Sequence, residues 1–133
     1  MKAWVITLLA VSAGFLMTCG MATAHHGGAG WDRTTTLNLK ANVTDFAFTN
    51  PHIQISFDAT DGKGSIAHWV AEGGSPAGLV RLGWSRNIIK PGDEVTIVGN
   101  PAKNGSKIIV LVKVVLANGQ ELNPQLNRPV DTQ

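Results

Sequence analysis

Short runs in which apolar and polar residues alternate constrain this chain most strongly, because a period of two places neighbouring side chains on opposite faces of a β-strand. The first run spans residues 35–49, and its apolar positions change parity halfway along. A parity change inside one long strand predicts a β-bulge, here near residues 44–45. The apolar positions are Leu37, Leu39, Ala41 and Val43, followed by Phe46 and Phe48.

Further runs of the same kind follow, separated by turn-forming residues such as Asn104-Gly105. Ser75-Pro76 opens a helix of about two turns, and Gly83 suits its left-handed end. The order of three strands, a short helix and two strands predicts an all-β chain with a five-stranded, OB-like Greek-key barrel. Another small barrel or a sandwich is the alternative. The expected later elements are strands at 53–59, 65–71, 95–97 and 107–117 and a helix at 76–82.

The first 24 residues have the order of parts of a secretory signal peptide. Lys2 provides the positive charge, residues 4–17 form an uncharged apolar run, and Ala22-Thr23-Ala24 supplies small residues for cleavage. We therefore expect a periplasmic protein whose mature chain begins at His25. An uncleaved anchor is one alternative, although the run is short for a bilayer span. Lipidation of Cys19 after a loose lipobox is the other.

Cleavage would leave 109 of the 133 residues, enough for one modest core. We expect a flexible His- and Gly-rich segment at 25–34, the barrel at 35–122 and a disordered polar tail at 123–133. The single cysteine leaves with the leader, so the mature chain is expected to form no disulfide and no thiolate metal site.

The charge and the motifs exclude several classes of function. Without Lys2, ten basic residues face nine acidic ones, and no cluster of lysines and arginines offers a phosphate-binding surface, so no nucleic-acid partner is expected. The serines lack a nucleophile-elbow motif, no phosphate-binding glycine loop occurs, and no His-Glu-x-x-His zinc motif is present. The sequence therefore predicts a protein that is not an enzyme.

Histidines suggest a metal site, with copper as the first candidate. A mature N-terminus at His25 would carry an α-amine and an imidazole on one residue, and nitrogen ligands in a plane suit Cu(II). His26, His52 or His68 could supply a further ligand, and His26 and His52 are the ones we expect. The alternative is that His25 and His26 form a mobile leader that binds metal weakly, because the glycines that follow them do not preorganise a site.

Aromatic and acidic residues at strand ends suggest a second kind of surface. Trp31 and Trp84 lie at expected element boundaries, where they form either a ligand-stacking platform or packing under loops. Glu72 precedes two glycines at a strand end and contacts either a ligand or solvent. Trp69 and His68 have opposite parity, and Trp69 is the better candidate for the inward face.

Several motifs together resemble a family of small exported proteobacterial proteins of unknown function. The resemblance implies an OB-like barrel in a Gram-negative periplasm, and it implies no activity, substrate or cofactor. It marks His25, His26, His52, Trp69, Glu72 and Trp84 as the positions to consider. This chain has Gly27-Gly28-Ala29-Gly30 where the family often has a serine and an aromatic residue. The motifs are Ala24-His25-His26, Thr49-Asn50-Pro51-His52, Trp69, Glu72-Gly73-Gly74-Ser75-Pro76, Arg81-Leu82-Gly83-Trp84, Lys90-Pro91-Gly92-Asp93 and Asn104-Gly105-Ser106.

Two functional hypotheses follow. The first is a non-enzymatic periplasmic binding or accessory protein that binds copper through His25, His26 and His52. The second is a metal-free module that binds a periplasmic protein or a small ligand on a barrel face marked by Trp31, Trp69, Glu72 and Trp84. The sequence does not indicate an oligomeric state.

Overall fold

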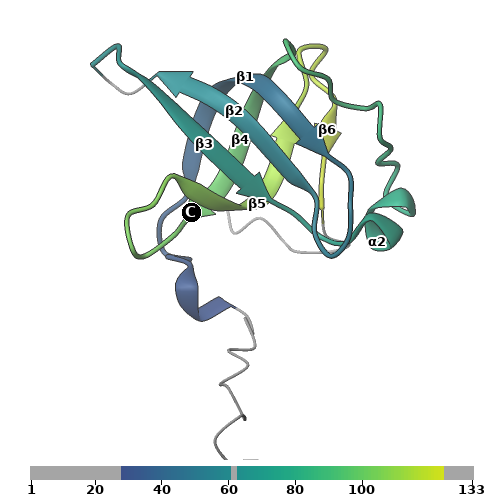
Figure 1. Cartoon of the computed structure of the whole chain (residues 1–133), viewed down its shortest axis with the longest axis horizontal. Coiled ribbons are helices and arrows are strands. Elements are labelled where there is room, and N and C mark those ends of the chain that lie inside the picture. The colour runs from purple at the N-terminus through teal and green to yellow at the C-terminus, as the bar shows by residue number, and fades with distance from the viewer. Residues whose placement is uncertain (1–27, 61–62, 125–133) are drawn as a thin grey trace, which may run out of the picture.

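The computed structural model describes residues 28–60 and 63–124. The regular structure in these ranges consists mainly of β-strands, with one short α-helix among them (Figure 1). This composition confirms the predicted all-β class. None of the helices within these ranges is long and apolar enough to cross a membrane. The elements are η1 (Gly28–Gly30), β1 (Leu37–Ala47), β2 (Gln54–Thr60), β3 (Ile66–Glu72), α2 (Pro76–Val80), β4 (Glu94–Pro101), β5 (Ile108–Val115) and β6 (Glu121–Leu122).

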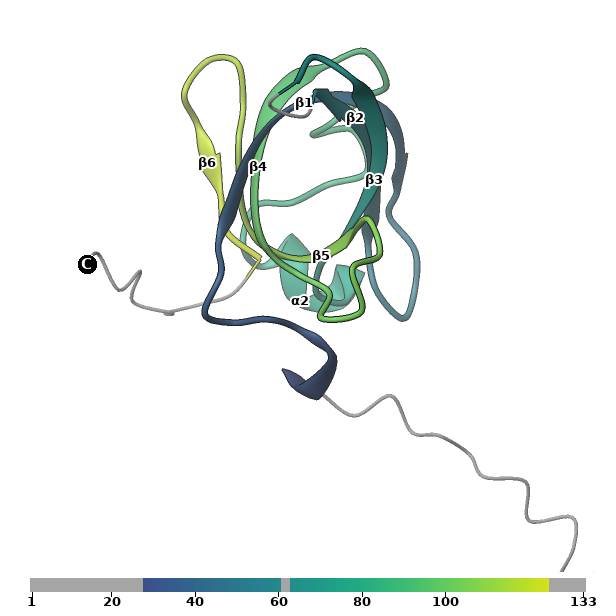
Figure 2. The ribbon, with the colours of Figure 1, turned by 90° about the vertical axis from the view of Figure 1, so that its left-hand side faces the viewer.

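The strands form one sheet that closes on itself. Their order is β3-β2-β1-β4-β5-β6, and β3 also pairs with β5. The β3–β5 pairing is parallel and all other pairings are antiparallel, so β1 to β5 make the predicted five-stranded Greek-key barrel (Figure 2). The two-residue strand β6 pairs with the end of β5 and stands outside the barrel.

The predicted bulge lies in the middle of β1. The register of β1 against β2 shifts between Val43 and Asp45, so that Val43 and Phe48 are both buried although their parity differs. The turn before β4 holds the bend, because the Gly92 N–H donates to the Val43 carbonyl at 2.7 Å and the Asp93 carbonyl accepts from the Val43 N–H at 2.9 Å. The bent strand pairs with β4 through its first half and with β2 through its second.

Alternate residues of each strand fill the barrel, as the period of two predicts. On β2 the inward positions are buried and the outward positions are exposed or half-buried. The largest fully buried side chains come from the strands, from the β1–β2 turn, from α2 and from the segment between α2 and β4: Trp84, Phe57, Ile53, Ile55, Leu79, Ile89, Ile97 and Ile109.

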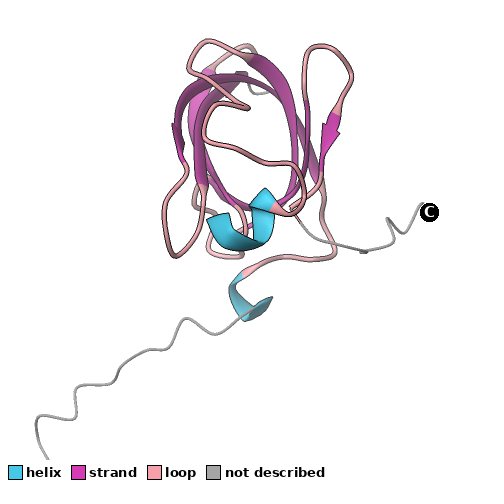
Figure 3. Ribbon diagram, turned by 90° about the vertical axis from the view of Figure 1, so that its right-hand side faces the viewer, coloured by secondary structure: helices cyan, strands magenta, loops and turns pink. Residues whose placement is uncertain are grey.

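The helix α2 lies against one end of the barrel (Figure 3). It ends at Val80, two residues before the expected end. Ser75 is its N-cap residue, but its side chain makes no capping hydrogen bond; its carbonyl accepts from the Leu79 N–H at 3.1 Å. Gly83 has the expected left-handed conformation, with φ of 86°. Leu79 is buried and contributes to the core.

Residues on both sides of the expected barrel bounds, 35–122, pack against the barrel. The segment expected to be flexible includes η1 and Trp31, and Trp31 bridges to Ala102 while the Asp32 N–H donates to the Pro101 carbonyl at 2.8 Å. Backbone pairing of this kind fixes residues 30–32 against the end of β4. On the C-terminal side of the expected bounds, Pro124 is buried. The expected leader at 1–24 and residues 125–133 of the expected tail lie outside the described residues.

Candidate functional site

His52 lies in the turn between β1 and β2. The next residue, Ile53, anchors this turn by accepting from the Gly73 N–H and donating to the Gly74 carbonyl, both at 3.0 Å. His52 itself is exposed, and its ring has no hydrogen-bond partner within residues 28–60 and 63–124. The β1–β2 turn thus exposes to solvent an imidazole that makes no hydrogen bond within the described residues. The other two predicted metal ligands, His25 and His26, lie outside the described residues.

The described chain begins on the same side of the barrel as the turn that carries His52. The Lys103 N–H donates to the Gly30 carbonyl at 2.9 Å, which holds η1 beneath the turn between β4 and β5. In Figures 1 and 2, η1 and the β1–β2 turn both lie below the strands of the barrel. Gly28 is only two residues after His26 in the sequence.

Glu72 ends β3 and is half-buried on the outer face of the sheet. Its carboxylate accepts from the Gln54 side-chain amide across the β2–β3 pair, at 3.4 Å. The following glycine leaves no room for a side chain, because a Cβ at Gly73 would lie 2.6 Å from the Ile53 side chain. The Glu-Gly-Gly motif therefore serves, in part, the close approach of β3 to the β1–β2 turn.

Trp69 is half-buried and faces inward, as its parity predicts, opposite the buried Phe57 on β2. The Lys107 ammonium lies 4.7 Å from the centre of the Trp69 ring. A cation over an indole face is a favourable contact. The Lys107 side chain thus already covers one face of the Trp69 ring.

Trp84 does not contribute to a ligand surface, contrary to the second hypothesis. Its side chain is 2% exposed, and its indole N–H donates to the Asn123 carbonyl at 3.1 Å. Trp84 packs inside because the turn after α2 directs it into the core, next to Phe46 with ring centres 6.5 Å apart. Trp31 is half-buried at the bridge to Ala102. The two tryptophans therefore form no shared stacking platform.

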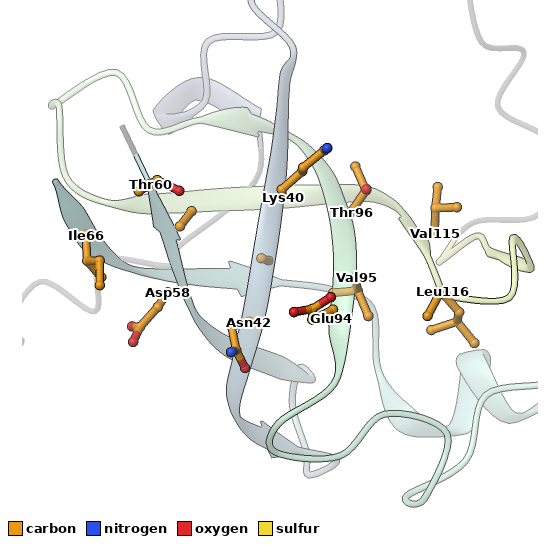
Figure 4. A pocket seen from close by; sticks show the side chains of 13 residues that line it. Lys40, Asn42, Asp58, Thr60, Ile66, Glu94, Val95, Thr96, Val115 and Leu116 are labelled. Carbon is orange, nitrogen blue, oxygen red and sulfur yellow. The ribbon is translucent and has the colours of Figure 1, made fainter. Parts of the chain in front are cut away.

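A broad, open hollow of about 750 Å³ lies over the outer face of the sheet, and sequence reasoning missed it (Figure 4). It crosses β1 and reaches from the start of β3 to the end of β5. Ile66 stands at one end, and Val115 and Leu116 stand at the other. Polar side chains occupy the space between these apolar ends.

A row of outward-facing polar residues runs across four strands at this hollow. The pairing register places Glu94 opposite Asn42, Asn42 opposite Asp58, and Asp58 opposite His68. The Asp58 carboxylate and His68 Nδ1 form a hydrogen-bonded pair, although the His68 side chain is 85% exposed. Each residue alone is unremarkable in the sequence; only the register between strands brings them together.

Described residues alone do not assemble a metal centre. Among residues 28–60 and 63–124, no group of three or more His, Cys, Asp or Glu side chains is placed to hold a metal ion. His52 and His68 belong to different elements, the β1–β2 turn and β3.

Comparison with known proteins places most of the chain in one family. The profile described as "Family of unknown function (DUF6152)" matches residues 14–110. No curated protein matches the chain.

Proposed function

The chain belongs to the family of unknown function DUF6152, and from this premise we propose that it is a non-catalytic, periplasmic binding or accessory protein whose ligand is a copper ion. Cleavage after Ala24 would free the α-amine of His25 beside its own imidazole. With His26 and His52, these groups make a nitrogen ligand set that suits Cu(II). A Gram-negative, proteobacterial source belongs to the same proposal.

The exposed ring of His52, which has no partner among the described residues, carries this proposal. The β1–β2 turn, which carries His52, and η1, where the described chain begins two residues after His26, lie at the same end of the barrel (Figures 1 and 2). An imidazole on an anchored turn loses little freedom when it binds, and the Lys103–Gly30 hydrogen bond likewise holds η1, which begins two residues after His26.

Calorimetric titration of Cu(II) tests the proposal. The protein is exported from a bacterial host, and its intact mass establishes that His25 is the first residue. We expect His52→Ala to weaken binding by at least about tenfold, the scale on which even an outer hydrogen-bonding partner of a metal ligand acts. His68→Ala is the matched control, because it removes another exposed imidazole, on β3, and should leave the affinity unchanged.

Two results would refute the copper assignment. One is an affinity no better than that of a free His-His peptide, and the other is unchanged binding by the His52→Ala variant. Electron paramagnetic resonance of the Cu(II) complex provides a second readout, since the loss of one nitrogen ligand changes the nitrogen hyperfine pattern.

The hollow over β1 favours a second candidate, a metal-free module that binds a protein or a small ligand. Its apolar ends offer surface for packing, and the polar side chains between them offer hydrogen-bond partners that can orient a ligand. The hollow takes the place of the aromatic barrel face in this second hypothesis, because Trp84 is buried and cannot contribute to such a face. In a pull-down from periplasmic extract with a chelator present, Asn42→Arg should abolish capture of a partner, whereas Thr44→Arg, at an exposed position outside the hollow, should not. Equal capture by both variants would exclude the hollow.

A further inference from the structure

The first half of β3 forms an open edge of the barrel. β3 pairs with β2 along its whole length, but it pairs with β5 only through Val70, Ala71 and Glu72. Within the described part of the chain, no strand pairs with the other side of residues 66–69. Figure 1 shows the same arrangement, with β5 meeting β3 only toward its arrowhead.

The direction of the backbone groups at this edge follows from the pairing. The Val70 N–H donates to the Lys107 carbonyl at 3.0 Å, so the backbone groups of Val70 point away from β2. In an antiparallel pair, residues that alternate along a strand direct their N–H and C=O groups to opposite sides. The backbone groups of Ile66 and His68 therefore face the open edge, while those of Ala67 and Trp69 bond to β2.

Three usual protections against strand pairing, a lysine, a proline and a bulge, are absent from residues 66–69 of β3, although this open stretch is short. Natural edge strands carry lysine, proline or a bulge, or are covered by another segment. β3 has the sequence Ile-Ala-His-Trp-Val-Ala-Glu and pairs with β2 without a register shift. Its first residue, Ile66, is 69% exposed, the highest exposure among the large hydrophobic residues of the described chain.

We propose that this edge binds a second copy of the chain, with the two β3 strands antiparallel about Ala67. The two residues whose backbone groups face outward, Ile66 and His68, are equally spaced about Ala67. A two-fold axis there would pair Ile66 of each copy with His68 of the other. These two pairs would satisfy the N–H and C=O groups of both residues in both chains.

The side chains fit the same symmetry. Ile66 and Val70 share the outer face of β3, together with His68. In the paired edges, Ile66 would have Ile66 and Val70 of the second copy as diagonal neighbours, within reach of a branched side chain. The exposed Ile66 thus gains apolar contacts with Ile66 and Val70 of the second copy, and these contacts between like side chains favour a second copy as the partner.

Sedimentation velocity over a roughly hundredfold range of concentration tests the proposal, because a dimer of this kind dissociates on dilution. We expect wild-type protein to shift from monomer to dimer, and Ile66→Lys to remain monomeric. Val80→Lys is the matched control, since Val80 is 59% exposed on α2 and its replacement should leave the dimer intact. Circular dichroism verifies that both variants fold.

Amide hydrogen exchange adds a readout that needs no variant. The amides of Ile66 and His68 should become protected as the wild-type concentration rises. A wild-type protein that stays monomeric throughout, a dimer that survives Ile66→Lys, or loss of the dimer with Val80→Lys would each overturn the proposal. Free exchange of both amides at every concentration would do the same.

Discussion

At the scale of single residues, Gly99 lies at a close approach of β4 and β5. The register of the two strands shifts between Val98 and Gly99. A Cβ at Gly99 would lie 2.6 Å from the Val110 carbonyl oxygen and 2.9 Å from the Ile109 side chain. The glycine is therefore required by packing against backbone, which cannot rotate away as a side chain can.

We predict that Gly99→Ala lowers the free energy of unfolding by about 1–3 kcal/mol, the usual cost of overpacking a core. Denaturant unfolding followed by circular dichroism measures the change. Gly30→Ala is the control, because nothing lies within 4 Å of a Cβ at Gly30. Equal stabilities of the two variants would contradict this account of Gly99.

Single residues also show what parity alone can and cannot predict. The choice of Trp69 over His68 for the inward face follows from parity and hydrophobicity, and the structure agrees. Trp84 lies outside any strand, so no period reports its direction, and its burial could not be read from the sequence. His68 finds Asp58 through a pairing between strands, which a single residue does not reveal.

At the scale of elements, the residues just before β1 form a compact hydrogen-bonded turn. The Asp32 carboxylate accepts from the Thr34 hydroxyl at 2.6 Å, from the Thr35 hydroxyl at 2.6 Å and from the Thr34 N–H at 3.0 Å. The hydroxyls of Thr34 and Thr35, in that order, lower the pKa of Asp32 from 3.8 to about 2. Hydrogen bonds to the charged form favour ionisation.

This shift predicts how acid affects the N-terminal segment. Because the folded pKa lies below the unfolded one, the ionised carboxylate contributes stability above pH 3.8, and this contribution is lost as the pH falls to about 2. Asp32→Asn should therefore be less stable than wild type at neutral pH, and the difference should vanish near pH 2. Asp45→Asn, at an exposed position on β1, is the control. A difference that persists unchanged in acid would argue against the hydroxyl contacts.

Elements with strong local signals were predictable. The parity change in β1 locates its bulge, and Gly83, Gly92 and Gly105 mark turns where φ is positive. The helix was expected at the right place but ends early, because Gly78 and Val80 favour a helix weakly. β6 is not among the expected strands, since two residues carry no period.

At the scale of the whole molecule, closure of the barrel could be predicted only as a class. The order of elements points to the OB-like topology, but the parallel β3–β5 pairing joins residues far apart in sequence and leaves no local pattern. The hollow and its polar row depend on that long-range register. The candidate site was therefore predictable only as separate residues.

Trp84 connects three distant parts of the fold, so its replacement should affect the stability of the whole molecule. It follows α2, packs beside Phe46 of β1, and donates to the carbonyl of Asn123 just after β6. Trp84→Phe keeps an aromatic ring but leaves a gap in the core and removes the donor to this carbonyl. We expect a loss of about 1–3 kcal/mol in the free energy of unfolding. Trp31→Phe, at a half-buried bridge, should cost less stability.

The amide of Leu122 should also exchange faster in Trp84→Phe than in Trp31→Phe, because β6 and the residue after it lose their attachment to the α2 region. If the two variants show the same stability and the same exchange at Leu122, the indole does not join these parts of the molecule.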